Sequence, residues 1–253
     1  MDIVMIGSGN VAAVLGRKFK AAGHDIVQVY SRNASKASKL AYEWDTESTN
    51  YKSLINPKAD VYIIAISDDA IDEVASGLKF PTKVVAHTAA SVPKEVLEKV
   101  SPHYGVFYPL QSLRKEVAEL PEIPIFFDGN DDRAKKTLAR LAASISEEKV
   151  RQAGNDERLK LHVAAVIVGN FTNHLYALAE QYSQQEGLEF SQLLPLIKET
   201  AARINEISPR VAQTGPALRH DGETILKHLE LLKTHPHLKN IYLLLTESIQ
   251  QWK

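Results

Sequence analysis

Short apolar segments and longer amphipathic segments alternate along the first part of the chain. Six short segments are rich in β-branched and aromatic residues and predict strands buried within a parallel sheet; they span residues 3–6, 25–30, 60–66, 83–86, 104–108 and 123–127. Segments with helical periodicity occupy residues 10–22, 35–44, 67–78 and 132–145. This alternation predicts an α/β fold with a Rossmann-like, doubly wound parallel sheet.

The pattern changes near residue 156. No strand-like segment follows, and Gly and Pro residues separate four segments with helical periodicity, at residues 157–185, 191–207, 221–234 and 238–252. We therefore predict two domains: a Rossmann-like domain at residues 1–152 and an all-helical domain at residues 153–253.

A glycine-rich segment directly follows the first predicted strand. It fits the G-x-G-x-x-G/A phosphate-binding fingerprint with Gly7, Ser8, Gly9, Asn10, Val11 and Ala12. The first glycine permits a tight turn, and the second lets a diphosphate approach the backbone. Because free N–H groups at a helix N-terminus attract phosphates, we predict that the first five of these residues bind a dinucleotide. A plain tight turn is the alternative. Gly16, one turn after Ala12, is expected to keep the helix thin against the strand.

The end of the second predicted strand favours NADP over NAD. An NAD site places a carboxylate about 20 residues after the glycines, whereas this chain has Ser31, Arg32 and Asn33 there. A guanidinium between two hydrogen-bonding side chains suits the 2′-phosphate of NADP, which a carboxylate would repel. The alternative is a solvated arginine before a helix, for which Ser35 is the expected cap.

Ligands of open α/β sheets bind beyond the carboxyl ends of the strands. Backbone groups near Ile66 and Ser67 are therefore candidates for cofactor binding. Residues 68–69 are two aspartates, and we expect them to cap a helix rather than to act as catalytic acids. His87 and Thr88 follow the next strand, within expected reach of a nicotinamide, but a structural role for the histidine is an equal alternative.

The first helix of the C-terminal half is apolar nearly all round between residues 161 and 178, which predicts a buried helix. At about 100° per residue, four polar residues nonetheless share one sector of it; they are His162, Asn170, Asn173 and His174. Buried polar groups need partners. The partners are either neighbouring helices or a substrate in a cleft between the two domains.

A Gly-Pro turn interrupts the helices at residues 214–221. Thr214 and Arg219 beside it are candidates for binding a carboxylate or phosphate of a substrate, and a plain interhelical loop is the alternative. His235 and His237 have neither carboxylate nor cysteine neighbours in the sequence, so we predict no metal site.

Composition narrows the possible classes of protein. The chain has 253 residues, of which 44% are hydrophobic and 24% charged, and a formal net charge of −1, which does not support binding of nucleic acid or of a membrane surface. The absence of cysteine excludes disulfides, thiol catalysis and cysteine-ligated zinc. Since no secretory signal and no apolar segment of about 20 residues is visible, we expect a cytoplasmic protein.

Several motifs together resemble a bacterial family that joins a Rossmann-like NADP-binding domain to a helical C-terminal domain of unknown function. They are the glycine fingerprint and residues 66–69, 87–88, 108–111, 162–171 and 214–216. The family is described as NADP-dependent oxidoreductases, similar to pyrroline-5-carboxylate reductase, deazaflavin-dependent NADP reductase and the 6-phosphogluconate dehydrogenase-like group. The resemblance implies a homodimer through the helical domain. It also implies a substrate site between the domains, for which Gln111 and Asn173 are further candidates.

One difference from that wider group concerns catalysis. Its hydroxyacid dehydrogenases use a lysine and an asparagine one turn later, but here Val166 stands four residues before Asn170. The lysine mechanism is therefore not carried over. His162 is the candidate proton donor or acceptor, and Asn170 the candidate that orients a substrate. The leading hypothesis is an NADP-dependent oxidoreductase that moves a hydride to or from a small polar metabolite. A non-catalytic NADP(H)-binding sensor is the alternative.

Overall fold

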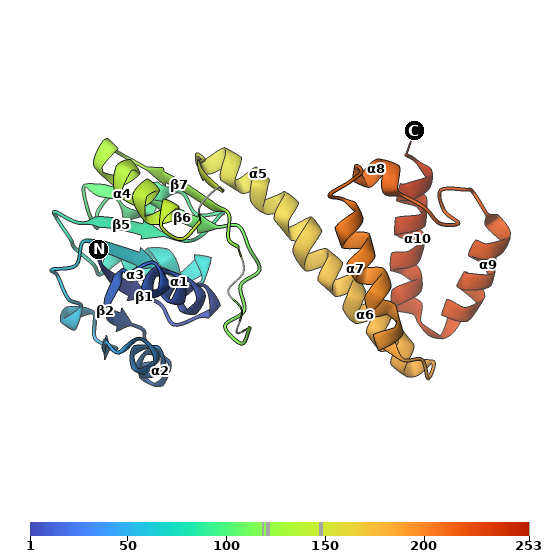
Figure 1. The fold of residues 1–253 in the computed structure, drawn as a ribbon, viewed down its shortest axis with the longest axis horizontal. Helices are drawn as coiled ribbons and strands as arrows, with labels where there is room; N and C mark the ends of the chain where they lie inside the picture. Colours follow the sequence, from blue (N-terminus) through green and yellow to red (C-terminus); the bar gives the residue numbers. More distant parts are fainter. Residues whose placement is uncertain (118, 120–121, 147–148, 253) are drawn as a thin grey trace. The chain divides into compact units, whose positions relative to one another are not determined.

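The computed structural model describes residues 1–117, 119, 122–146 and 149–252. Its first part is the predicted Rossmann-like arrangement of helices around one sheet (Figure 1). The described residues form an eight-stranded sheet in the order β3-β2-β1-β4-β5-β6-β7-β8. The strands are β1 Asp2–Ile6, β2 Asp25–Tyr30, β3 Glu47–Thr49, β4 Val61–Ile64, β5 Val84–His87, β6 His103–Pro109, β7 Ile125–Gly129 and β8 Val150–Gln152.

The sheet is parallel except between β6 and β7, which pair antiparallel. β1 lies between β2 and β4, so the chain reverses its direction of winding at β1, and such a switch point is where these sheets bind ligands. Two strands were not predicted, β3 and β8. Both are three-residue edge strands without a buried residue, and therefore lack the apolar pattern that marks the other strands.

Different helices cover the two faces of the sheet. α1 (Asn10–Ala21), α2 (Ala34–Trp44) and α4 (Asp132–Ala143) share a core with Ile3 and Met5 of β1. The alternate residues of β1 pack instead with α3 (Ile71–Ser76). Since successive strand residues point to opposite faces, β1 is buried on both sides, as its apolar sequence predicts.

Local hydrogen bonds set the helix ends. Gly23 has a φ of 78° and ends α1 as predicted. The predicted cap of α2 is wrong, because Asn33 and not Ser35 accepts the backbone N–H of Lys36, at 2.9 Å. The capping role predicted for residues 68–69 is also wrong. A 3₁₀ turn precedes α3, and neither the turn nor the helix starts with a side-chain cap.

Gly16 serves a different contact from the one predicted. A Cβ at this position would come within 2.2 Å of the indole ring of Trp44. The small residue therefore makes room for a side chain of α2, and α1 and α2 pack closely through it.

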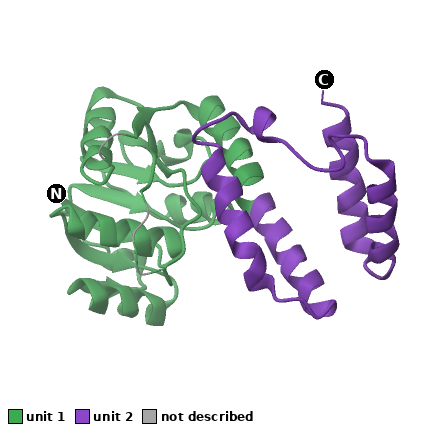
Figure 2. Cartoon of the chain, turned by 45° about the vertical axis from the view of Figure 1, so that its right-hand side comes forward, with its two compact units in different colours: residues 1–170 green, residues 171–253 purple. Residues whose placement is uncertain are grey.

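The chain divides into two compact units, an N-terminal unit of Met1–Asn170 and a helical unit of Phe171–Lys253 (Figure 2). α5 (Asn155–Ala165) belongs to the N-terminal unit, so this unit extends beyond residue 152, where we predicted the boundary. A π-helical segment, Val166–Phe171, follows α5. Its wider turns change the angle per residue, so the sector predicted at about 100° per residue for His162 and the later polar residues stays a prediction.

The second unit is helical, as predicted. Its helices are α6 Thr172–Gln185, α7 Leu194–Arg203, α8 Pro209–Ala212, α9 Gly222–Leu231 and α10 Pro236–Gln250. Within the described part of the chain, no helix is long and apolar enough to cross a membrane.

The prediction of a buried helix between residues 161 and 178 is wrong for the single chain. Val163, Ile167, Val168 and Phe171 are between 54% and 74% exposed. Apolar periodicity indicates only that a surface is suited to being covered, and it does not say which chain covers it.

Candidate functional site

The turn between β1 and α1 requires glycine at its first position. Gly7 has a φ of 127°, and a Cβ there would lie 2.1 Å from the carbonyl oxygen of Ala65. Its N–H donates to the carbonyl oxygen of Tyr30 at 2.8 Å, which ties the turn to the end of β2. Any other residue would collide with the backbone of the adjacent strand, so the tight turn depends on Gly7.

The second glycine leaves the front of α1 open. Apart from its chain neighbours, no described residue comes within 4 Å of the place where a Cβ of Gly9 would stand. Gly9 caps α1 without a side-chain hydrogen bond, and its carbonyl oxygen accepts the N–H of Ala13 at 3.0 Å. The earlier N–H groups of the first helical turn have no acceptor among the described residues. Together with the helix dipole, they form a site suited to a phosphate.

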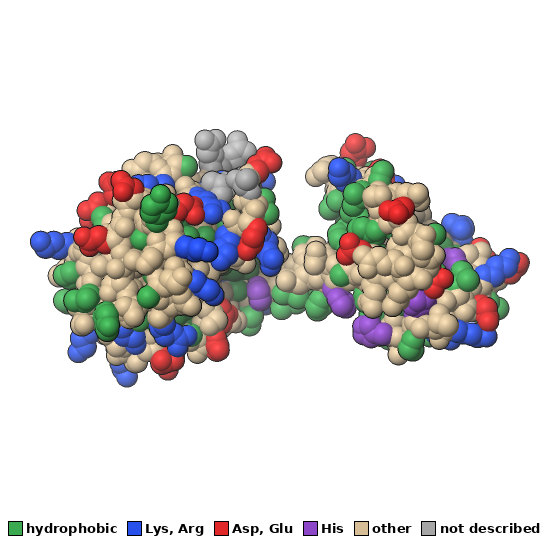
Figure 3. Space-filling model, turned by 90° about the horizontal axis from the view of Figure 1, so that it is seen from below, with side chains coloured by type: hydrophobic (Ala, Val, Ile, Leu, Met, Phe, Trp, Pro, Cys, Tyr) green, Lys and Arg blue, Asp and Glu red, His purple; other side chains and the backbone are tan. Residues whose placement is uncertain are grey.

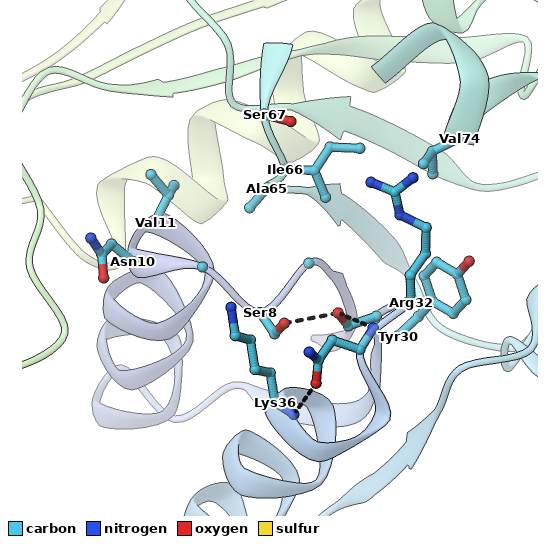
Figure 4. Close-up of a pocket in the computed structure, with 14 residues that line it drawn as sticks. Ser8, Asn10, Val11, Tyr30, Arg32, Lys36, Ala65, Ile66, Ser67 and Val74 are labelled. Atoms are coloured by element: carbon cyan, nitrogen blue, oxygen red, sulfur yellow. Dashed lines mark hydrogen bonds between the residues drawn. The ribbon is translucent and has the colours of Figure 1, made fainter. Parts of the chain in front are cut away.

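A pocket of about 480 Å³ opens in front of this turn (Figure 4). Its walls come from the β1–α1 turn, the end of β2 with the segment that follows it, the start of α2, the segment after β4 and α3. The predicted cofactor-binding residues that line it are Gly7, Ser8, Gly9, Asn10, Val11, Ser31, Arg32, Asn33, Ile66 and Ser67. Sequence reasoning missed four more lining residues, which are Tyr30, Lys36, Ala65 and Val74.

Hydrogen bonds hold two of the predicted selectivity residues at the pocket. The Ser8 hydroxyl donates to the Ser31 hydroxyl at 2.8 Å and so joins the turns that follow β1 and β2. The backbone N–H of Asn33 also donates to the Ser31 hydroxyl, at 3.3 Å. Since Oδ1 of Asn33 caps α2, its side-chain amide group has a fixed position beside the pocket.

Two cationic side chains line the pocket, Arg32 and Lys36. Figure 4 shows Lys36 reaching toward Ser8. The Arg32 guanidinium lies 3.7 Å from the Glu73 carboxylate, but these side chains are 65% and 71% exposed, so the ion pair is weak. Lys36 lies in the first turn of α2, directly after the cap Asn33, and its place in the sequence just after the predicted selectivity residues was the signal that could have found it. The two cations suit the dianionic 2′-phosphate of NADP.

His87 and Thr88 are not among the residues that line this pocket. His87 is 0% exposed; its Nδ1 accepts the N–H of Ala89 at 3.2 Å, and its Nε2 lies 3.4 Å from the carbonyl oxygen of Pro93. Burial, assisted by the charge of Arg158, lowers the pKa of His87 to about 4, so the imidazole is neutral at pH 7. These contacts favour the structural alternative for the histidine. Cofactor binding by either residue stays a prediction.

The loop after β5 is held from two sides. The Ser91 hydroxyl donates to the carboxylate of Asp68, which follows β4. Arg158 of α5 is 1% exposed and donates to the carbonyl oxygens of Ala90, at 3.2 Å, and Val92, at 2.8 Å. Asp68 thus positions this loop and does not cap a helix. The arginine fixes α5 against the carboxyl edge of the sheet.

His162 contacts a tyrosine that sequence reasoning did not select as a site residue. Its Nδ1 lies 3.1 Å from the hydroxyl of Tyr108, and the two rings meet edge to face with centroids 6.2 Å apart. Tyr108 lies near the end of β6, and burial raises the pKa of its phenol, as does the charge of Asp68, while Arg158 opposes the shift. The pair therefore lies at the same carboxyl edge of the sheet as Asp68. No local sequence signal links residues so far apart along the chain.

The other candidates lie in both units. Gln111 is exposed and donates to the carbonyl oxygen of Glu122 at 3.4 Å, and Asn170 is the exposed last residue of the N-terminal unit. Asn173, Thr214 and Arg219 belong to the helical unit. None of these five lines the pocket beside the glycine turn. Their roles toward a substrate stay predictions.

A largely parallel sheet with a glycine turn at its switch point, and a pocket over the adjacent strand ends, defines a Rossmann-type nucleotide-binding protein. Residues 2–91 match the family described as NADP oxidoreductase, coenzyme F420-dependent, and residues 123–249 match the domain of unknown function DUF2520. The chain belongs to the family of NADP oxidoreductases that combines these two parts, which confirms the resemblance found in the sequence.

Solved structures of oxidoreductases share the fold. The crystal structure of a candidate NADP oxidoreductase from Bacteroides fragilis is 39% identical, has a TM-score of 0.93, and the match covers 99% of this chain and 98% of that one. A pyrroline-5-carboxylate reductase from Coxiella burnetii is 15% identical, with a TM-score of 0.61 and coverage of 99% and 98%. A reductive aminase from Aspergillus terreus, in complex with NADPH and ethyl-5-oxohexanoate, is 13% identical, with a TM-score of 0.73 and coverage of 99% and 92%. The last two likenesses concern the fold alone.

A curated relative is the glutamyl-tRNA reductase of Methanosphaera stadtmanae, which is 20% identical over 207 residues. The match covers 82% of this chain, and the chain spans about half, 50%, of the length of that relative.

Proposed function

We propose that this chain is an NADP-dependent oxidoreductase that transfers a hydride to or from a small polar metabolite. The observation that carries the proposal is the pocket that joins the open N-terminus of α1 to the Arg32 and Lys36 side chains. NADP supplies the hydride chemistry when bound, and the protein supplies binding and orientation. The family description, and the NADPH held by the reductive aminase of the same fold, support the assignment.

Different residues of the pocket bind different parts of NADP. The N–H groups of Gly9, Asn10 and Val11 bind the diphosphate at the front of α1. The side chains of Arg32 and Asn33, with Lys36, bind the 2′-phosphate of the adenosine ribose. A hydrogen bond to a charged group contributes about 1.5–3 kcal/mol, so this second contact selects NADPH over NADH by at least about tenfold.

For the hydride-transfer step, we propose that His162 and Asn170 act on the substrate, with Asn170 as a hydrogen-bond partner that orients it. Support comes from the position of the Tyr108–His162 pair at the carboxyl edge of the sheet, where Asp68 directly follows the lining residue Ser67. Ligands of this class of sheet bind at that edge.

Titration calorimetry with NADPH and NADH tests the cofactor. We expect NADPH to bind the wild-type chain more tightly, and Arg32→Gln to lose at least about tenfold in NADPH affinity while NADH affinity stays unchanged. Arg114→Gln is the matched control, because Arg114 is equally exposed, with 69% of its side chain accessible, and lies outside the pocket. A preference for NADH would refute the role of Arg32, and absence of binding by either nucleotide would refute the function.

Hydride transfer is tested with a panel of cyclic imines, ketoacids and a deazaflavin, followed by the absorbance of NADPH. Oxidation of NADPH by a member of the panel supports the enzyme. Tight NADPH binding without turnover across the panel would contradict the enzymatic part of the proposal and favour an NADP(H) sensor.

We also propose that the helical unit associates with a second copy of the chain to form a homodimer. Large apolar side chains on its helices are widely exposed, among them Val211 at 71%, Leu226 at 68% and Leu244 at 66%. Figure 3 shows apolar side chains at the surface of this unit. Soluble monomers rarely expose so much apolar surface. In a twofold dimer each copy offers the same surface to the other.

A further inference from the structure

The hydrogen bond between Tyr108 and His162 determines which nitrogen of the imidazole carries the proton. The phenol hydroxyl has one proton, and Nδ1 of His162, at 3.1 Å, is its only hydrogen-bond partner among the described residues. A phenol is a better donor than acceptor toward an imidazole nitrogen with a free electron pair. When the imidazole is neutral, Tyr108 therefore donates to Nδ1, and the ring proton resides on Nε2.

The surroundings of Tyr108 keep this proton on the phenol. The ring is 8% exposed, and burial raises the pKa of the hydroxyl, with a further contribution from the negative charge of Asp68. Arg158 is the one positive charge that opposes this shift. The phenol is therefore a donor at neutral pH.

Arg158 fixes the position of α5, and therefore the geometry of the Tyr108–His162 pair. This arginine lies one helical turn before His162 on α5, is 1% exposed, and bonds to the carbonyl oxygens of Ala90 and Val92. Since residues four apart share a helix face, anchoring Arg158 also positions the imidazole relative to β6. Nε2 of His162 makes no hydrogen bond with any described residue, whereas Nδ1 is engaged.

We propose that Tyr108 is a positioning residue that holds His162 as the neutral Nε2–H tautomer, so that the imidazole offers a hydrogen-bond donor to the carbonyl oxygen of the substrate. The contribution to catalysis rests on the proposed function, but the tautomer does not. In this role no bond to hydrogen is broken at His162. As the hydride of NADPH adds to the carbonyl carbon, the Nε2–H group stabilises the negative charge that develops on the carbonyl oxygen, and water then supplies the proton of the alcohol product.

Nitrogen NMR on protein labelled with ¹⁵N-histidine tests the tautomer without a substrate. At a pH where the imidazole is neutral, we expect a pyrrole-type signal from Nε2 of His162 and a pyridine-type signal from Nδ1 that is displaced by its hydrogen bond. The signals are assigned by their loss in His162→Gln. In Tyr108→Phe, the displacement of Nδ1 should disappear and the Nδ1–H tautomer should increase.

The helical unit provides a matched control. Nδ1 of His228 lies 2.8 Å from the hydroxyl of Tyr242, a pair of the same kind within the helical unit. Tyr242→Phe should change the signals of His228 and leave those of His162 unchanged. A pyrrole-type Nδ1 on His162 in the wild-type protein would overturn the proposal, whether or not the protein binds NADPH.

A kinetic comparison tests the donor role once a substrate is in hand. The side-chain amide of glutamine also offers an N–H donor, so His162→Gln should retain kcat within about tenfold of wild type, whereas His162→Leu should lose it. A general acid or base contributes about 10²–10⁴-fold. A loss of that size in both variants would overturn the proposal.

Discussion

The N-terminal unit and the helical unit bury their apolar residues to very different extents. In the first, side chains on both faces of the sheet are fully buried, such as Ile3 and Phe107 on one face and Val4 on the other, all at 0% exposure. In the second, the buried hydrophobic residues are confined to Leu178, Ala217 and Leu232 among the described residues, while many leucines of the same helices are exposed. The N-terminal unit completes its core within one chain, and the helical unit does not.

This difference separates the two proposed tasks of the molecule. The nucleotide pocket is built on a complete core, so its geometry depends on local packing around Gly7 and Gly9. The helical unit has apolar faces that the single chain leaves exposed, and its stability is expected to depend on protein concentration.

The largest effect is expected from charges placed on the exposed apolar helices. Burying a leucine stabilises by about 1.5–3 kcal/mol, so Leu226→Lys combined with Leu244→Lys should weaken dimerisation at least about 100-fold. Sedimentation velocity measures the change. Tyr42→Lys combined with Leu54→Lys is the control, since these residues are 92% and 61% exposed in the N-terminal unit. An unchanged dimer in the first variant, or a monomeric wild type, would contradict the proposed interface.

The glycine turn gives a paired prediction on the other unit. Gly7→Ala forces a Cβ against the carbonyl oxygen of Ala65, and we expect a loss of about 3 kcal/mol in unfolding free energy together with loss of NADPH binding. Gly9→Ala meets open space, so it should leave stability within about 0.5 kcal/mol and weaken NADPH binding alone. Urea denaturation and calorimetry measure both. Equal stability losses in the two variants would show that Gly9 serves packing rather than phosphate binding.

His87 makes the sheet sensitive to acid. Its pKa is about 4 in the folded chain, below the usual 6.5, because the buried ring resists protonation. The unfolded chain therefore binds more protons between these values, and stability falls as the pH drops from 6.5 toward 4, by about 3 kcal/mol from this group. His87→Gln should flatten this part of the stability curve relative to wild type. Parallel curves for both proteins would exclude a buried neutral His87.

The smallest effect is expected at the contact of α1 with α2. Gly16→Ala brings a methyl group against Trp44, at a cost of about 1–3 kcal/mol, but gains about 1 kcal/mol in helix propensity. We expect a net loss of about 1 kcal/mol in urea denaturation, with NADPH affinity unchanged. A more stable variant would mean that the indole is not held as closely as described.

The features that could be predicted from the sequence are those with local signals. The apolar run before Gly7, the fingerprint itself and the helix stop at Gly23 depend on neighbouring residues, and the structure has all three. The strands β3 and β8 were not predicted, because three-residue edge strands without buried residues carry no apolar pattern. Asn33 and Ser35 are both residue types that favour the N-cap of a helix. Only the backbone conformation at the start of α2 determines which of them is the cap.

The candidate site was predicted where it follows the fingerprint and missed where it depends on long-range packing. Lys36 stands in the first turn of α2, directly after the predicted residues Ser31, Arg32 and Asn33, and could have been found. The contact of Tyr108 with His162, and the anchoring of the Ala90 loop by Arg158, join segments that only the folded sheet brings together. The exposure of Val168 was not predictable, because an apolar face looks the same whether its own chain or a second copy covers it.

Backbone NMR of the wild-type protein during titration with NADPH tests the central claim most directly. The N–H signals of Gly9, Asn10 and Val11 should shift in proportion to saturation, because they are the proposed donors to the diphosphate. NADH should shift the same three signals but leave those of Asn33 and Lys36 in place, since it lacks the 2′-phosphate. Saturating NADPH that leaves the amides of Gly9, Asn10 and Val11 unchanged would contradict the assignment of this turn as the nucleotide site.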